Sequence, residues 1–339
     1  MNTPDIIIYH SRDLDGLSSG AVLLSVYGEV NPNMKVIGYH YKELFDTRFT
    51  KSKNVVIVDV SLDMQKMFSM SRMAKNMTWI DHHKSQYDEL LQYCENNNYE
   101  VKEMKFNDLI TMIEVRKEDG TLCFTKFYSE RLSAAEVTIR LYGDKLGDIY
   151  HDAVAMLGQY DTWRNVPERQ LLKDKHWEKQ ILPFQYGMRL HETVFDVQKK
   201  LELLADWQSG HFTDAVITEG MAIIKYQETI NKKNMRFTKE IELRTDNAVY
   251  TGIAFNGGPF NSQTFKSKFN PDVHDFMMPY QFQGAAWNFS LYTTKDDVDI
   301  LSIAKQFGGG GHKQACGFQL EPNKVVFDEE GNLIMLAEV

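Results

Sequence analysis

The first half of the chain alternates short apolar runs with segments of helical periodicity, and this alternation limits the folds available to it. The apolar runs have the length of buried strands, and the segments between them place apolar residues at helical spacing. The strand-like runs are residues 5–9, 34–38, 54–58 and 77–80, and the helix-like segments are 17–27, 62–75 and 85–96. The pattern predicts an α/β domain with a mainly parallel, doubly wound sheet and helices on both faces.

The later part of the chain predicts two further regions. Residues 100–131 carry a turn signal at Asp119-Gly120 between β-rich runs, so we expect a hairpin inserted in the sheet. We assign residues 1–192 to the first domain, 193–235 to a helical linker and 236–339 to a smaller α/β domain. An active site in the cleft between the two domains is the expected arrangement.

Composition excludes several classes of protein. The chain has 339 residues, 43% of them hydrophobic and 25% charged, which suits a globular protein of two domains. Its formal net charge of −9 argues against a broad basic surface for long duplex nucleic acid. The three cysteines are widely separated and lack zinc spacing, and no segment has the length and hydrophobicity of a signal peptide or membrane span. We therefore expect reduced thiols, no membrane contact and a cytoplasmic location.

The stretch HSRDLDG, residues 10–16, places His10, Asp13 and Asp15 at a predicted strand-to-helix turn. Two carboxylates held so close repel each other unless a cation or a bound proton compensates. The alternative is that Asp13, Asp15 and Ser18 cap the helix, a frequent use of these residue types. The stretch also contains Gly-x-Ser-x-Gly around Ser18, the pattern of a hydrolase nucleophile elbow.

More acidic and histidine residues stand at the ends of later strands. Asp59 follows the run VVIV, and Asp81, His82 and His83 follow TWI. Because the carboxyl ends of parallel strands share one edge of a sheet, these side chains should meet those of the first turn. Asp161, in GQYDTW, could reach the same edge. Such a cluster repels itself without metal, whereas two divalent cations would neutralise it.

The donor types indicate which metal is expected. Carboxylate oxygens with some imidazole favour manganese, with magnesium or cobalt as substitutes, and the absence of cysteine ligands argues against structural zinc. The predicted cofactor is therefore a pair of divalent cations, most simply Mn²⁺.

These residues resemble a known family. The ordered strings HSRDLDG, VDVS, IDHHKS and QYDTW resemble the four motifs of the DHH phosphoesterases, and FGGGGHKQACGF resembles the signature of the DHH-associated domain of nanoRNase-type enzymes and related exonucleases. The resemblance spans about residues 5–320. It implies that His10, Asp13 and Asp59 hold one metal and that Asp15, Asp59, His82 and Asp161 hold the other, with Asp59 as the bridge. Asp81 would orient an imidazole, and His83 would contact the phosphate or protonate the leaving oxygen.

The same resemblance implies a substrate-binding region in the second domain. The expected substrate contacts there are Gly309, Gly310, Gly311, His312, Lys313 and Tyr292. Arg12 flanks the predicted metal site, where it could attract phosphate or be a solvated surface charge. Glycine lets backbone amides approach an anion closely, and we expect this glycine run to lie at a strand-to-helix boundary. Tyr292 stands where many relatives carry an arginine, so its contact is expected to be a stacked base or a hydroxyl hydrogen bond rather than an ion pair.

The expected activity is hydrolysis of short single-stranded oligonucleotides, or of linear dinucleotides such as pGpG, to nucleoside monophosphates. Nucleotide bisphosphates, cyclic dinucleotides and polyphosphate are alternative substrates for the same site. A serine hydrolase using Ser18 would leave Asp59, Asp81 and Asp161 unexplained, and a non-catalytic nucleotide sensor would be expected to lack one or more ligands. The sequence leaves the oligomeric state open, including a homodimer.

Overall fold

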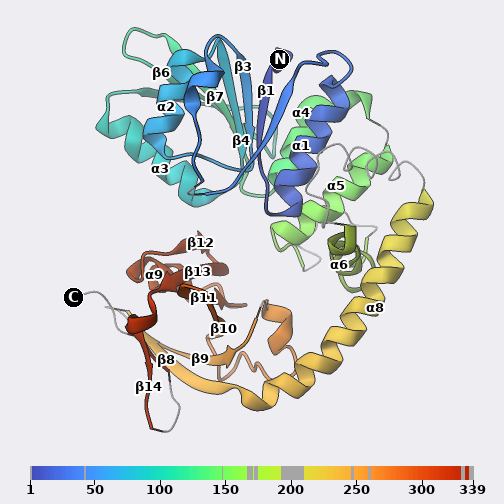
Figure 1. Ribbon diagram of the computed structural model, residues 1–339, viewed down its shortest axis with the longest axis vertical. Helices are drawn as coiled ribbons and strands as arrows, with labels where there is room; N and C mark the ends of the chain where they lie inside the picture. Colours follow the sequence, from blue (N-terminus) through green and yellow to red (C-terminus); the bar gives the residue numbers. More distant parts are fainter. Residues whose placement is uncertain are drawn as a thin grey trace. The chain divides into compact units, whose positions relative to one another are not determined.

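The computed structural model describes residues 2–41, 43–146, 148–165, 171, 175–191, 210–245, 248–258, 261–329 and 333–335. It divides into two compact units, Met1–Ile224 and Lys225–Val339. The division falls inside helix α8, Gly210–Asn234, which Figure 1 shows as the long yellow helix. The domain limits 1–192, 193–235 and 236–339 stay a prediction.

The first unit contains a seven-stranded sheet in the order β2-β1-β3-β4-β7-β6-β5. Its strands are β1 (Ile6–His10), β2 (Lys35–Tyr39), β3 (Asn54–Val58), β4 (Asn76–Asp81), β5 (Glu100–Lys105), β6 (Thr111–Arg116) and β7 (Leu122–Tyr128). The five strands from β2 to β7 are parallel, and β6 and β5 continue the sheet antiparallel. The predicted mainly parallel α/β sheet is confirmed, and the expected turn at Gly120 connects β6 to β7.

Helices cover both faces of this sheet (Figure 1). Helices α1 (Leu14–Tyr27) and α4 (Ala134–Tyr142) pack on one face, and α2 (Met64–Met73) and α3 (Lys84–Asn96) pack on the other. Alternate strand residues supply the two cores: Ile8 packs with α2 and α3, whereas its neighbour Ile7 packs with α1 and α4. Burial on both faces explains why the strands read as continuous apolar runs.

A helical layer completes the first unit. Helices α5 (Asp148–Asp161) and α6 (Leu182–His191) pack with the first part of α8 around Phe184 and Val216. A Cβ on Gly220 would collide with the carbonyl of Pro183, so α6 and α8 approach too closely there for any larger residue. The predicted helical stretch from 193 is described only from residue 210 onward, and residues 192–209 lie outside the described part.

The second unit is built on a six-stranded sheet in the order β12-β13-β11-β10-β9-β8. Its strands are β8 (Lys239–Arg244), β9 (Val249–Asn256), β10 (Phe276–Gln283), β11 (Ala286–Tyr292), β12 (Gly310–His312) and β13 (Ala315–Leu320), with helix α9 (Ile300–Gln306) beside them and a separate pair β14 (Val325–Phe327) and β15 (Leu333–Met335). Burial alternates along β11 and β13, because one face packs on the core around α9.

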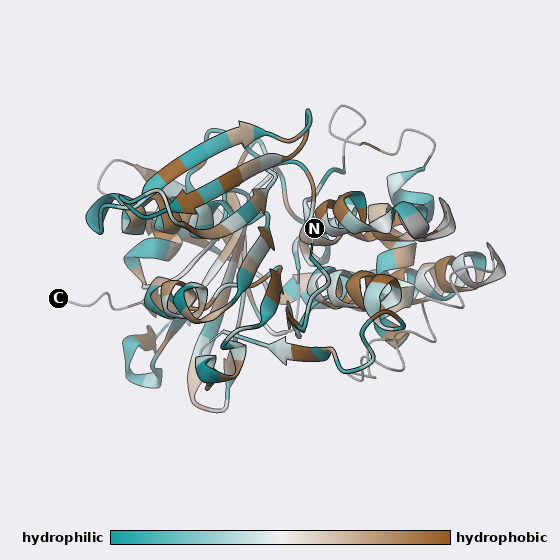
Figure 2. Ribbon diagram, turned by 90° about the horizontal axis from the view of Figure 1, so that it is seen from above, coloured by the Kyte–Doolittle hydropathy of each residue, from teal (hydrophilic) through white to brown (hydrophobic). Residues whose placement is uncertain are grey.

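The helices of the chain are amphipathic, with hydrophobic residues that pack inward and hydrophilic residues between them. Hydrophobic and hydrophilic residues alternate along them, as Figure 2 shows by colour. Among the described helices, none combines the length and the hydrophobicity needed to cross a bilayer.

Candidate metal centre

The candidate ligands gather where the chain order of the first sheet reverses. Strand β1 lies between β2 and β3. The chain therefore continues from β1 to a strand on one side, and then crosses to the strand on the other side. In open α/β sheets, ligands bind at the carboxyl ends of the strands beside such a reversal. His10 ends β1, Asp59 follows β3 and Asp81 ends β4, so all three lie at this edge.

His10 and Asp13 lie at the turn from β1 to α1. Asp13 is the N-cap of α1, and its Oδ1 accepts a hydrogen bond of 2.9 Å from the amide of Gly16. Its Oδ2 lies 2.5 Å from Nδ1 of His10. Helix capping and metal binding are therefore compatible, since each uses a different oxygen. Gly16 is required because a Cβ there would collide with the backbone of His10.

Asp59 lies between two groups of ligands. Its Oδ2 is 3.6 Å from Nδ1 of His10, and its Oδ1 is 3.5 Å from Nε2 of His82. The side chain is buried, yet neither oxygen has a hydrogen-bond partner. Its backbone has a φ of +58°, a left-handed conformation that is uncommon for a residue other than glycine. Two unsatisfied buried carboxylate oxygens, directed at two histidines, fit a carboxylate that bridges two cations.

The second group combines residues from three segments. Nε2 of His82 lies 3.6 Å from Oδ2 of Asp15 and 3.3 Å from Oδ2 of Asp161. Asp161 is the last residue of α5, and its side chain is 32% exposed. The structure thus brings together His10, Asp13 and Asp59 as one group that could hold a metal ion, Asp15, His82 and Asp161 as another, and Asp59, His82 and His83 as a third.

The electrostatics of this cluster favour cations. Burial raises the pKa of Asp59 well above its usual value, and the nearby carboxylates of Asp13 and Asp15 raise it further. Desolvation at this crowded edge also raises the pKa of Asp161, although its side chain is 32% exposed, and Asp15 and Asp13 raise it further. Protons or divalent cations would relieve this repulsion. The residues present therefore fit a pair of divalent cations.

Lys126 is a member of this site that the sequence did not reveal. It lies on β7, fully buried, and its Nζ donates a 3.2 Å hydrogen bond to Oδ2 of Asp81. Oδ1 of Asp81 accepts from the amide of His82 at 2.9 Å and lies 2.8 Å from Nδ1 of His83. Lys126 and the two histidines together keep the pKa of Asp81 well below its usual value, although burial opposes this. Asp81 thus holds the ring of His83 and the backbone of His82, and it belongs to none of the candidate metal groups.

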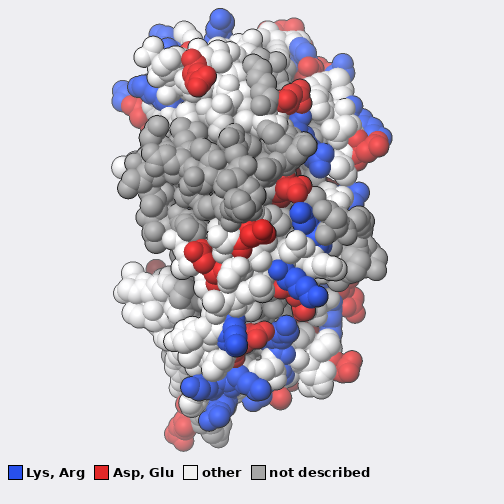
Figure 3. Space-filling model, turned by 90° about the vertical axis from the view of Figure 1, so that its right-hand side faces the viewer, with Lys and Arg blue, Asp and Glu red and all other residues white. Residues whose placement is uncertain are grey.

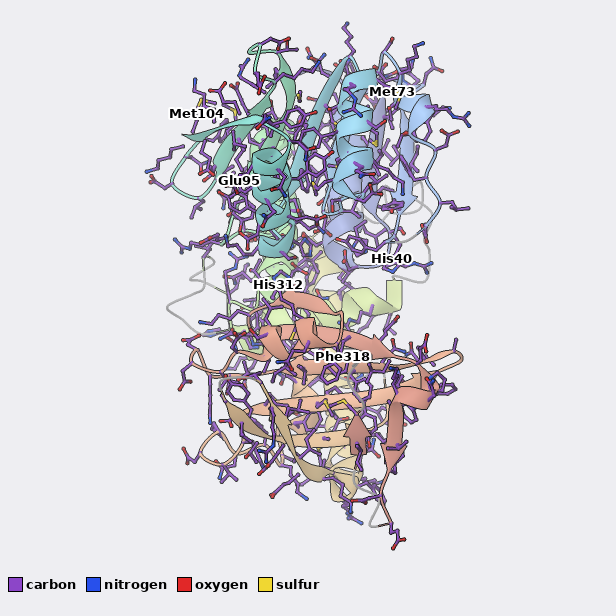
Figure 4. All side chains as sticks on the ribbon, turned by 90° about the vertical axis from the view of Figure 1, so that its left-hand side faces the viewer. His40, Met73, Glu95, Met104, His312 and Phe318 are labelled. Atoms are coloured by element: carbon purple, nitrogen blue, oxygen red, sulfur yellow. The ribbon has the colours of Figure 1, made fainter. Side chains whose placement is uncertain are left out.

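His40 is a second neighbour that the sequence did not reveal. It follows β2, at the position labelled in Figure 4, and its Nδ1 lies 3.0 Å from Nε2 of His10. The two rings stack with their centroids 5.3 Å apart. Since Nδ1 of His10 faces Asp13 and Asp59, a proton on Nε2 would leave Nδ1 as the metal-binding atom.

The sheet of the second unit places two of the expected substrate residues on one face. Ala315 on β13 pairs with His312 on one side and with Tyr292 on the other, so the three side chains form a row. The next row on that face is Gly310, Gly317 and Ser290. The opposite face carries core residues such as Phe318, which Figure 4 labels with His312, and Tyr292 itself packs against a smaller core that contains Met277. A floor of small residues thus lies between Tyr292 and His312.

The glycine run has a different setting from the one predicted. We expected a strand-to-helix boundary, but α9 ends just before the run and β12 begins inside it, at Gly310. Gly308, with φ of +71°, ends the helix, and a Cβ on Gly309 would collide with the backbone of Gly317. Gly311, with φ of +138°, lies close to the backbone of β13. Gly308 and Gly310 both have open space at the Cβ position, but Gly308 has a φ of +71°, so backbone geometry accounts for Gly308, Gly309 and Gly311.

The remaining candidates lie on exposed or helical positions. Arg12 is exposed, with Nη2 3.5 Å from the carboxylate of Glu43, and Lys313 is exposed in the turn between β12 and β13. Ser18 is buried inside α1, which begins four residues earlier at Leu14. A nucleophile elbow needs its serine exposed at the strand-to-helix turn. The position of Ser18 therefore argues against the serine hydrolase alternative.

The fold and the site together define an α/β protein with a cluster of carboxylates and histidines, able to hold metal ions, at the carboxyl edge of the parallel strands. No protein-family model matches the chain. An uncharacterised protein of Acanthamoeba polyphaga mimivirus, R106, is 23% identical over 335 residues, which cover 92% of this chain and 66% of that protein. The chain therefore spans slightly less than two thirds of that relative.

Solved structures give distant similarities. The pGpG-specific phosphodiesterase PggH from Vibrio cholerae matches with 14% identity and a TM-score of 0.46, covering 94% of each chain. An exopolyphosphatase-related protein from Bacteroides fragilis matches with 12% identity and a TM-score of 0.45, covering 93% of this chain and 86% of that one. Because both TM-scores are low, the site is interpreted from its own geometry.

Proposed function

We propose that the chain is a phosphodiesterase of the DHH type that uses two divalent cations to hydrolyse short single-stranded oligonucleotides or linear dinucleotides. The observation that carries this proposal is the position of Asp59, whose two buried, unpartnered oxygens face His10 and His82. A carboxylate in that position is costly unless cations compensate it.

Each residue of the cluster has a role in this proposal. His10 and Asp13 hold one cation, Asp15, His82 and Asp161 hold the other, and Asp59 bridges them. Bound there, the cations would lower the pKa of a water molecule and neutralise charge on the phosphoryl oxygens.

His83 is proposed to act on the phosphate or the leaving oxygen. Asp81 engages Nδ1 of His83, which directs the remaining ring nitrogen away from Asp81. Although burial alone would lower it, the Asp81 carboxylate raises the pKa of His83 to about 9. A protonated imidazole is suited to donate a hydrogen bond to a phosphate oxygen or a proton to the departing alkoxide.

The face of the second sheet that carries Tyr292 and His312 is proposed to grip the substrate. Tyr292 lies on β11 and His312 on β12, and β13 with Ala315 runs between these strands, so the two residues are about 10 Å apart. A flat base could lie on this low floor against either ring, while His312 and the open backbone at Gly310 contact a phosphate.

Charge supports a short substrate. Acidic and basic side chains are interspersed on the face shown in Figure 3, and the net charge of the chain is −9. Long nucleic acid binds through many simultaneous phosphate contacts, which require an extended basic surface. A dinucleotide needs only a few contacts, and the cations supply part of the positive charge.

A substrate panel tests the proposal. Purified protein with manganese is incubated with pGpG, a ladder of short RNAs, a cyclic dinucleotide, a nucleoside 3′,5′-bisphosphate and polyphosphate, and products are separated by chromatography. We expect mononucleotides from pGpG and short RNA, none with a chelator, and none from Asp59→Asn. Turnover of polyphosphate or the bisphosphate alone would overturn the assignment of substrate. Chelator-resistant hydrolysis would overturn the metal-dependent mechanism.

A further inference from the structure

Asp15 is fixed by the start of a helix that is distant in sequence. The backbone amides of Ala134 and Ala135, the first two residues of α4, donate hydrogen bonds of 2.8 and 2.9 Å to the two oxygens of Asp15. These amides have no partner within their own helix, and the positive end of the helix dipole favours a carboxylate there. The position of Asp15 is therefore set by the position of the α4 N-terminus.

Glu136 connects this N-terminus to the segment that carries Asp161. Glu136 and Ser133 form a capping box, in which the carboxylate of Glu136 accepts a 3.0 Å hydrogen bond from the amide of Ser133. The same oxygen, Oε2, is ion-paired with Nη2 of Arg164. Arg164 lies three residues after Asp161, and its Nε donates a 2.7 Å hydrogen bond to Oγ1 of Thr162.

The chain leaves room for this connection. Gly158, in the last part of α5, has no side chain at the point where a Cβ would collide with the carboxylate of Glu136. Glu136 and Arg164 are 2% and 4% exposed, so both charges have been removed from water. Oε1 of Glu136 and Nη1 of Arg164 are buried without a hydrogen-bond partner.

Stability alone does not account for such a pair. A buried ion pair recovers its desolvation cost only when geometry is good and the remaining polar atoms are satisfied. In this pair, one oxygen of Glu136 and one nitrogen of Arg164 have no hydrogen-bond partner. The pair nevertheless joins α4, whose N-terminus holds Asp15, to the segment that follows Asp161. Asp15 and Asp161 belong to the same candidate metal group. The group of His10, Asp13 and Asp59 is built differently. His10 and Asp13 lie in the same short turn, with Nδ1 of His10 2.5 Å from Oδ2 of Asp13.

We propose that Glu136 and Arg164 are positioning residues for the metal group of Asp15, His82 and Asp161, and that the group of His10, Asp13 and Asp59 does not depend on them. The inference rests on the metal binding of the proposed function but not on hydrolysis. It assigns the two metal sites different structural supports, so that one can be weakened without the other.

The two metal groups can be tested separately in variants that retain only one of them. Asp13→Asn impairs the first group and leaves the second, whereas Asp161→Asn impairs the second and leaves the first. Glu136→Gln is added to each, because glutamine keeps the shape and the acceptor for Ser133 but removes the charge. Binding of MnCl₂ to the metal-free full chain is measured by calorimetry. We expect Glu136→Gln to weaken manganese binding about ten- to hundredfold in Asp13→Asn, the range for residues that orient ligands, and to leave it unchanged in Asp161→Asn.

Controls distinguish this role from general destabilisation. Thr138→Val changes another fully buried polar residue of α4, whose hydroxyl donates to the carbonyl of Ala134, and should leave manganese binding unchanged in both backgrounds. Circular dichroism confirms that each variant is folded. If Glu136→Gln does not fold, Arg164→Lys replaces it; lysine keeps the charge opposite Glu136 but loses the bond to Thr162, so a smaller loss confined to Asp13→Asn is expected.

Equal weakening in the two backgrounds, or none in either, would overturn the proposal. Failure of the proposed function gives a different result: manganese binding that shows the selective loss, in a protein that hydrolyses no phosphodiester.

Discussion

Lys126 and Asp81 form a fully buried ion pair, with Nζ of Lys126 3.2 Å from Oδ2 of Asp81. The ammonium also lies over the ring of Trp79, 3.1 Å from its centroid. Burial lowers the pKa of Lys126 to about 8, while the Asp81 carboxylate opposes that shift. Because the other oxygen of Asp81 contacts the amide of His82 and the ring of His83, the pair ties the geometry of both histidines to a residue on the neighbouring strand.

The first prediction concerns this pair. Lys126→Met removes the cation and leaves the Asp81 carboxylate buried and uncompensated, which should lower the free energy of unfolding by about 3–5 kcal/mol. Urea unfolding of the metal-free protein measures the loss. The double variant Lys126→Met with Asp81→Asn should recover much of the stability but not the turnover, because an amide does not hold His83 as a carboxylate does. A Lys126→Met protein as stable as wild type would contradict the buried ion pair.

The second prediction separates the bridge from the residue that orients the histidines. Asp59→Asn should weaken both manganese sites, because it removes the charge that faces both His10 and His82. Asp81→Asn should leave two manganese ions bound and lower turnover, since Asp81 contacts the histidines and belongs to neither of the two groups that hold Asp13 and Asp161. Manganese is counted by electron paramagnetic resonance of the free ion. Two full sites in Asp59→Asn would refute the bridge.

The third prediction is a pH dependence. The pKa values of Asp59 and Asp161 are raised by burial and neighbouring carboxylates, so the folded, metal-free protein holds protons there that the unfolded chain releases. Stability of the metal-free protein should therefore fall as pH rises above the ordinary carboxyl value, and manganese must displace the protons in order to bind. We expect manganese to raise Tm more at about pH 7.5 than at about pH 5.5, with protons released on binding. An equal increase at both pH values would contradict the raised pKa values.

The fourth prediction tests the face of the second sheet. His312→Ala should spare hydrolysis of a small activated phosphodiester that needs no gripping, and slow that of a dinucleotide. Losing one hydrogen bond to a charged group costs about 1.5–3 kcal/mol, or about ten- to a hundredfold in rate. Comparing both substrates on one preparation cancels errors in active fraction. An equal loss of rate on both substrates would mean that His312 acts in folding or in the chemical step. No loss of rate on either substrate would mean that this face has only a structural role.

Much of the sheet could be predicted because its signals are local. The predicted strand 54–58 has the bounds of β3, and Asp59 follows it directly. Parallel pairing then brings Asp59 to the same edge as His10 and His82, which is a consequence of topology rather than of sequence distance.

The missed contacts depend on pairings between distant segments. Lys126 meets Asp81 only because β7 pairs with β4, 45 residues away, and the predicted hairpin did not specify that neighbour. His40 meets His10 because β2 lies beside β1. The setting of the glycine run was predicted wrongly because Gly308 ends a helix, a role that a glycine-rich string shares with a phosphate-binding turn.

The most direct test of the account is a titration of manganese into metal-free protein with hydrolysis of pGpG followed at each addition. Asp59 lies between two groups of ligands, so activity should appear only as the second equivalent binds and should level off at two ions per chain. Full activity at one equivalent, or activity without added metal in the presence of a chelator, would contradict a two-metal centre.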